Sequence, residues 1–235
     1  YYGMYNGVEC QLIIRTPMGG YRGYGPTHSQ TLEKLLFGFS NLTIIACNTI
    51  HDQCLIWKRI ISLKNPCLYI ENKILYGQKV KSIINERIDS FFVSSSNSYF
   101  PTTSLYLTQD PPDVILFTYG EQLETAILTS KKLFVEEEVI VKIVVPSQIS
   151  PLPKEDLISC LGKCKRVVTL EEGIVDNGWG SYVISFLAEK ITHKVNFRRC
   201  GALNSVIPTS LLGETEVLPN SEKLYELIIE MTNEI

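Results

Sequence analysis

Residues 13–33 read IIRTPMGGYRGYGPTHSQTLE, and this stretch decides how the first half of the chain is interpreted. A short apolar run at 11–15 predicts a strand, which leads into a loop with four glycines at positions 19, 20, 23 and 25. Glycine tolerates positive φ and lets backbone or ligand approach closely, so such a loop is suited to a site. We expect a helix to begin at His28-Ser29-Gln30, with Ser29 as its N-cap. The pattern predicts an imidazole at the carboxyl end of a strand, where open α/β sheets bind ligands.

Strand-like and helix-like periodicities alternate along the rest of the chain. Apolar residues at helical spacing (Leu32, Leu35, Leu36, Phe39) precede an expected strand at 43–47, a helix at 49–63 and a strand at 67–71. In the helix at 49–63, Thr49 and Asp52 are placed like a capping box. Further strands are expected at 113–118, 139–145, 166–170 and 194–199, and further helices at 121–134, 153–162, 179–190 and 221–233. This order predicts mostly parallel sheets with helices on both faces.

The expected fold is α/β, with two three-layer domains. Residues 86–112 are rich in Ser and Pro, which is typical of a connector on the surface. We therefore expect a first domain at 1–85, a linker at 86–112 and a second domain at 113–235. The chain begins with Tyr1 rather than Met, and its first domain is short of strands, so we expect a fragment or a processed product.

Composition narrows the class of protein. The chain has 235 residues, of which 45% are hydrophobic and 20% charged, as in ordinary soluble α/β proteins. A net charge of −3 gives no electrostatic basis for binding nucleic acid or an anionic membrane. No apolar run is long enough to span a bilayer. The seven cysteines match no secreted disulfide framework, which favours a reducing, cytoplasm-like compartment.

Four motifs together resemble one family, the beta subunits of thiamine-diphosphate-dependent 2-oxoacid dehydrogenases, within the transketolase-like group. They are the glycine-rich loop with His28, NPCLYIENKILYG at 65–77, DVILFTYG at 113–120 and VTLEEGIVDNGWG at 168–180. The resemblance covers nearly the whole chain. It implies part of a pyrimidine-binding domain followed by a transketolase C-terminal domain.

The resemblance implies a function that needs a second subunit. An alpha-type partner would hold Mg²⁺ and the diphosphate of a shared thiamine diphosphate, in an alpha2beta2-like heterotetramer that decarboxylates a 2-oxoacid oxidatively. The acyl group would pass to a lipoyl-bearing acyltransferase, in the cytoplasm or, in a eukaryote, in the mitochondrial matrix. The family's activating glutamate has no counterpart here, so the chain alone is expected to be inactive.

The resemblance also implies site residues. His28 would line the channel near the reacting carbon of the cofactor, where an imidazole that titrates near neutral pH can move protons; the alternative is that His28 only caps a helix. A potassium site would use the backbone carbonyls of Leu12, Ile60, Ile61, Leu63 and Asn65, although Lys64 brings positive charge close to it. His51 is interpreted as a surface or cap-region residue, and His193 as structural.

Two departures from the family pattern leave alternatives open. Residues 147–152 lack the family's arginine, and residues 201–208 lack its aspartate. Glu171 and Glu172, neighbours on a strand that point to opposite faces, are interpreted as interface or turn structure rather than as an acid/base pair. The alternatives are a non-catalytic assembly half of a split or degenerate thiamine enzyme, or a transketolase-like acyl or ketol transferase.

Overall fold

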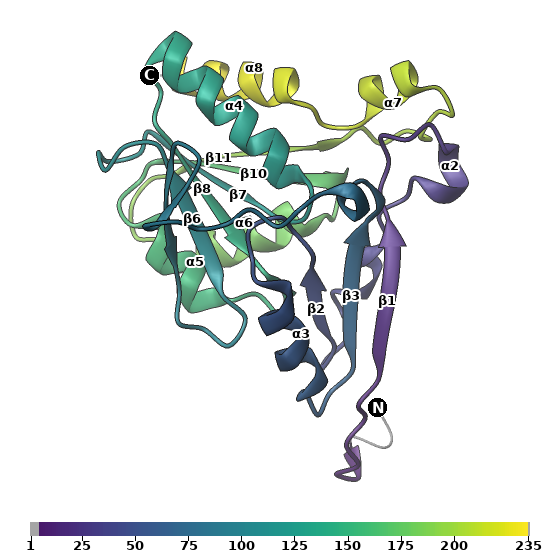
Figure 1. Cartoon of the computed structure of the whole chain (residues 1–235). Coiled ribbons are helices and arrows are strands. Elements are labelled where there is room, and N and C mark those ends of the chain that lie inside the picture. Colours follow the sequence, from purple (N-terminus) through teal and green to yellow (C-terminus); the bar gives the residue numbers. More distant parts are fainter. Residues whose placement is uncertain (1–4, 235) are drawn as a thin grey trace.

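A computed structural model describes residues 5–234 as two β-sheets covered by helices (Figure 1). In the smaller sheet, β1 (Ile13–Met18), β3 (Cys67–Asn72) and β2 (Thr43–Ala46) run parallel in that order, and β9 (Gln148–Ser150) pairs antiparallel with β2. Helix α3 (Gln53–Ile61) packs Ile56 and Ile60 against one face of this sheet. Apolar runs in parallel strands are expected where both faces are to be covered.

The larger sheet is half parallel and half antiparallel. Its parallel strands are β11 (Asn196–Ala202), β10 (Arg166–Ile174), β7 (Val114–Thr118) and β8 (Val141–Pro146), and its antiparallel strands are β6 (Thr102–Tyr106), β5 (Phe91–Ser95) and β4 (Arg87–Ile88). Helices α4 (Gln122–Glu137) and α8 (Ser221–Asn233) contribute to the core on one face. Helices α5 (Lys154–Leu161) and α6 (Trp179–Lys190) contribute to the core on the other. The predicted α/β fold class with two sheets is confirmed.

The two sheets form one packed body. A single apolar cluster contains Met18, Ile44 and Leu68 from the smaller sheet together with Phe117 and Trp179 from the larger one. Strand β9 follows β8 after one residue and crosses to the smaller sheet. The position of the N-terminal strands is therefore fixed by the C-terminal half of the chain.

The segment expected to be a linker contains regular structure. Strands β4, β5 and β6 lie within residues 86–112 and extend the larger sheet. Phe91, Val93 and Leu105 point into the core, whereas Ser94 and Ser104 pair on the opposite face. Antiparallel strands with one polar face have a composition close to that of a loop, which explains why the sequence suggested a connector.

The helix expected to begin at Ser29 is absent from the structure. A short α2 (Gly25–His28) ends there, with Ser29 as its C-cap, and only a 3₁₀ turn, η1 (Glu33–Leu36), follows. Beyond α2, β9 and the three strands β4, β5 and β6, the structure has two further elements that were not predicted, a 3₁₀ turn η2 (Lys73–Gly77) and helix α7 (Leu211–Val217). Helix α3 starts at Gln53 with Asp52 as N-cap, so Thr49 is not part of a capping box. Among the described residues no helix has the length and apolarity of a bilayer span.

Candidate functional site

His28 lies exposed at the C-terminal end of α2, beside a cavity of about 440 Å³. The cavity lies at the carboxyl end of β1, since Thr16, Pro17 and Met18 line it. Figure 1 shows that the chain leaves the sheet there toward α2. With His28, its walls are formed by Thr16, Pro17, Met18, Tyr24, Thr27, Gln30, Leu32 and Lys73. The ring nitrogens of His28 have no hydrogen-bond partner among residues 5–234, so they remain available to donate or accept a proton.

Lys73 gives this cavity a positive charge. Its Nζ donates to the carbonyl oxygen of His28 and lies 5.3 Å from the centre of the Tyr24 ring. No carboxylate is among the residues that line the cavity in the described chain. An anionic group would therefore be favoured there over a cationic one.

Carboxylates from the C-terminal half hold the glycine-rich loop. The backbone N–H of Gly20 donates to Glu172 Oε1 (2.7 Å), and that of Gly23 donates to Glu214 Oε2 (2.8 Å). Tyr21 donates its hydroxyl to the carbonyl oxygen of Pro219 (2.7 Å). The loop from the smaller sheet is thus anchored on β10 and α7 of the other half.

Gly19 is required by both conformation and space. Its φ is +96°, and a Cβ there would lie 2.0 Å from Nδ2 of Asn72. That same amide donates to Glu172 Oε2 (2.7 Å). Any side chain at position 19 would displace the group that orients Glu172.

Glu171 and Glu172 have separate structural partners, as expected for neighbours on a strand. Glu171 accepts from the N–H groups of Trp179 (2.7 Å) and Gly180 (2.8 Å) at the start of α6. Burial raises the pKa of Glu171 to about 8, although the two N–H donors act in the opposite direction. Burial, and next the nearby Glu121, raise the pKa of Glu172 well above its ordinary value. Neither carboxyl group faces the other as an acid/base pair would.

Two buried acids near the site were missed by sequence reasoning. Glu214 lies on the unpredicted α7, and Glu33 accepts from the Tyr119 hydroxyl at 2.5 Å. Burial raises the pKa of Glu33. No local pattern marks these residues, because their partners are 86 or more positions away in the sequence.

The residues predicted for potassium lie at the opposite end of the smaller sheet from His28. Leu12 precedes β1, Ile60 and Ile61 end α3, and the carbonyl of Leu12 already accepts from Cys67 N (2.8 Å). Lys64 is paired with Glu9 at 2.6 Å, so its charge is partly balanced. In the part of the chain that is described, no group of three or more His, Cys, Asp or Glu side chains is arranged to hold a metal ion. The potassium site, which would use carbonyls including those of Leu63 and Asn65, stays a prediction.

The other two histidines do not belong to the cavity. His51 lies just before the cap of α3 but is buried, bonded through Nδ1 to Asn48 (2.8 Å) and through Nε2 to Thr103 (3.0 Å), so the surface interpretation was wrong. Burial lowers the pKa of His51 to about 4. His193 is exposed and contacts the carbonyl of Cys164.

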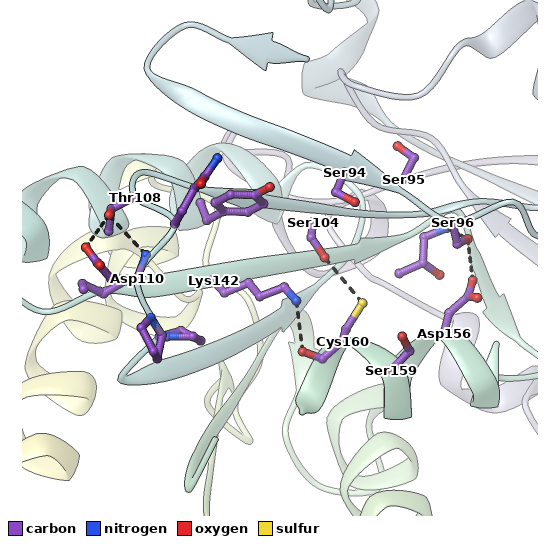
Figure 2. A pocket seen from close by; sticks show the side chains of 16 residues that line it. Ser94, Ser95, Ser96, Ser104, Thr108, Asp110, Lys142, Asp156, Ser159 and Cys160 are labelled. Carbon is purple, nitrogen blue, oxygen red and sulfur yellow. Dashed lines mark hydrogen bonds between the residues drawn. The ribbon is translucent and has the colours of Figure 1, made fainter. Parts of the chain in front are cut away.

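A larger cavity, about 670 Å³, lies elsewhere, between β5, β6 and α5 (Figure 2). Its charged groups are bonded within the protein. Asp156 accepts from Ser96 (2.8 Å), and Lys142 donates to the carbonyl of Cys160 (3.1 Å). These charged groups have hydrogen-bond partners within the protein, whereas the imidazole of His28 has none among residues 5–234.

The chain is similar to proteins of known function. It is 25% identical over 183 residues to "Pyruvate dehydrogenase E1 component subunit beta-1, mitochondrial" of Arabidopsis thaliana, covering 78% of this chain and 48% of that protein. It is 22% identical over 230 residues to "Acetoin:2,6-dichlorophenolindophenol oxidoreductase subunit beta" of Bacillus subtilis, covering 97% of this chain and 64% of that protein. The chain therefore spans about half to two thirds of the length of these relatives.

A solved structure and a family model agree with the fold. The solved "Split gene transketolase, inactive beta4 tetramer" superposes with a TM-score of 0.68 at 16% identity, covering 94% of this chain and 67% of that one. The model of the family described as "Transketolase, C-terminal domain" matches residues 105–224, just over half of the sequence. The chain therefore belongs to the transketolase C-terminal domain family, and its curated relatives include beta subunits of the pyruvate dehydrogenase and acetoin types.

Proposed function

We propose that this chain is the beta-type component of a thiamine-diphosphate-dependent 2-oxoacid dehydrogenase, active only with an alpha-type partner. The observation that carries the proposal is the exposed imidazole of His28 in a positively charged cavity at the end of a parallel strand. Lys73 would attract the carboxylate of a 2-oxoacid, and His28 would donate or accept the proton that moves during acyl transfer.

The lining fits one wall of a thiamine site. Pro17, Met18 and Leu32 offer apolar surface to a heteroaromatic ring. When bound, thiamine diphosphate supplies the nucleophilic carbon and the electron sink for decarboxylation. The absence of a carboxylate from the described lining means that the group bonding the aminopyrimidine would come from outside it. The diphosphate and Mg²⁺ would be held by the partner.

Exposed apolar side chains on the segment that carries His28 and on the neighbouring α7 support the need for a partner. We call Tyr24, Leu32, Leu35, Leu211 and Leu212 the apolar rim; they are 47%, 48%, 67%, 61% and 76% exposed. Helix α7, which carries two of them, lies beside α2, since Glu214 bonds Gly23 (Figure 1). Exposed apolar residues gathered around a cavity mark protein interfaces. An alpha-type chain, assembled into an alpha2beta2-like complex, would cover this rim.

Reconstitution tests the proposal. The chain is coexpressed with an alpha-type protein that carries a diphosphate-binding motif, and thiamine-dependent decarboxylation of pyruvate and branched-chain 2-oxoacids is measured. We expect His28→Ala to lower kcat by about 100-fold or more, as for loss of an acid/base group, and His193→Ala to leave it unchanged. Full activity of His28→Ala would exclude His28 from the reaction.

A second candidate is a non-catalytic assembly half of a split thiamine enzyme. The observation that favours it is the lack of any carboxylate around the His28 cavity in the described chain. In that case the complex would form, but calorimetry would detect no uptake of thiamine diphosphate.

A further inference from the structure

A single buried carboxylate bonds both flanks of the segment that carries His28. Glu214 Oε2 accepts from the N–H of Gly23 (2.8 Å), and Glu214 Oε1 accepts from the hydroxyl of Ser29 (2.8 Å). His28 and the whole of α2 lie between these two contacts. Glu214 is 1% exposed and Ser29 is fully buried, so water does not compete for either bond.

Helix α2 cannot hold this position by itself. It has four residues, and its N-cap, Tyr24, makes no side-chain cap bond. A helix this short is unstable alone, because its hydrogen bonds do not offset the ordering of the backbone. Gly23 and Gly25, with φ of +69° and +68°, add conformational freedom at its start. The direction of the imidazole is therefore set by contacts to other elements.

Glu214 is itself held rigidly. Ser210 caps the N-terminus of α7, since its hydroxyl oxygen accepts from Gly213 N (3.0 Å). At the other end of the helix, Val217 and Leu218 pack in a small apolar core. From the other side, the ammonium of Lys73 donates to the carbonyl of His28. The segment is thus held by one group from α7 and one from η2.

We propose that Glu214 is a positioning residue for His28. It acts through Gly23 and Ser29 and is not among the residues that line the cavity. The catalytic consequence rests on the function proposed above, whereas the structural consequence does not.

Amide hydrogen exchange of the chain, followed by mass spectrometry, tests the structural part. In Glu214→Ala we expect peptides within 19–32 to exchange about tenfold faster or more, while peptides from β7 and β10 are unchanged. Glu214→Gln should stay near the wild type, because its amide oxygen can accept from Gly23 while its amide nitrogen donates to the Ser29 hydroxyl. Glu216→Ala, an exposed position on the same helix, is the matched control. Unchanged exchange in a folded Glu214→Ala would overturn the proposal.

A milder variant provides a second test in case Glu214→Ala does not fold. Ser29→Ala removes only one of the two contacts, so faster exchange should be confined to peptides covering residues 25–30. If Ser29→Ala exchanges like the wild type, the hydroxyl contact positions nothing and the proposal fails.

Kinetics of the reconstituted complex test the catalytic part. We expect Glu214→Ala to lower kcat about tenfold or more with little change in KM, and Glu214→Gln to restore it. A wild-type complex without thiamine-dependent activity would reject the proposed function but leave the exchange result intact. Faster exchange with unchanged kcat would show that Glu214 holds the loop without serving His28.

Discussion

Buried ionisable side chains gather where the two sheets meet. Glu33, Glu171, Glu172 and Glu214 are each at most 3% exposed, and each has a specific hydrogen-bond donor. A buried carboxyl group must be hydrogen-bonded or protonated, since an isolated buried charge is too costly. The stability of this protein should therefore depend on pH through a few identifiable groups.

His51 is expected to make the fold sensitive to acid. Its pKa is about 4 when folded and 6.5 when unfolded, so protons bind preferentially to the unfolded chain. Its contribution is present above pH 6.5 and is lost as pH falls toward 4, by up to about 3 kcal/mol. Urea unfolding at several pH values should show a smaller loss over this window in His51→Gln than in the wild type. His193→Gln is the control, and an identical pH profile in His51→Gln would contradict the prediction.

Glu171 is expected to make the folded protein less stable as pH rises. Its folded pKa of about 8 lies above the ordinary value of 4.5, so the folded chain keeps a proton that the unfolded chain releases. Its contribution is full below pH 4.5 and declines as pH rises through 8, by up to about 1.4 kcal/mol per pH unit. The stability difference between wild type and Glu171→Gln should shrink over this range, whereas that for the exposed Glu189→Gln should stay constant. A constant difference for Glu171→Gln would show that the carboxyl is ionised in the folded protein.

At the scale of elements, side chains bond the N-terminal N–H groups of three helices, α3, α6 and α7. Asp52 caps α3, Ser210 caps α7, and Glu171 bonds the first N–H groups of α6. These bonds satisfy N–H groups that have no partner inside the helix. For α6 the carboxylate comes close because Gly178 and Gly180 have no side chains; a Cβ on Gly178 would lie 2.3 Å from Glu171 Oε2.

Removing the cap of α3 should weaken the smaller sheet. Asp52 accepts from Cys54 N (2.9 Å) and Leu55 N (3.1 Å), so Asp52→Ala should lower the free energy of unfolding by about 1 kcal/mol. Asp52→Asn keeps an acceptor and should cost much less. Denaturant unfolding with an unchanged m-value is the measurement, and equal stabilities of the two variants would contradict the capping role.

At the scale of the whole molecule, the two sheets share one core, and exposed apolar side chains lie on the segment that carries His28 and on α7. The shared core and β9 join the sheets, while the apolar rim remains open around His28. A protein built this way folds around its own core but has a surface suited to another chain.

Leu212 should matter for assembly rather than for folding. It is 76% exposed on α7, so Leu212→Glu should leave the melting temperature of the chain unchanged yet weaken binding of an alpha-type partner about tenfold or more. Val135→Glu, 79% exposed on α4, is the matched control. Sedimentation or calorimetry with the partner gives the affinities, and equal binding by both variants would remove α7 from the interface.

The sequence alone was sufficient for elements with sustained apolar periodicity or an apolar strand run, and it failed for short helical turns and for strands with one polar face. Helix α6 was predicted at 179–190 and α8 at 221–233, both as observed, because their apolar periodicity is sustained. The stripe at Leu32 and Leu35 predicted a helix, but Glu33 turns inward to Tyr119 and leaves both leucines exposed. The spacing of apolar residues does not show whether they pack against the rest of this chain or stay exposed on its surface.

The amino-acid sequence by itself determined the α/β class, the glycine-rich loop and the place of His28 after the first strand, because these depend on local pattern and on motifs. Only the tertiary structure decided that Glu172 and Glu214 hold that loop, that residues 86–112 contain three strands, and that β9 crosses to the smaller sheet. The physical reason is distance along the chain: Gly20 is bonded across 152 positions and Ser29 across 185. Such pairings exist only once both sheets have packed together.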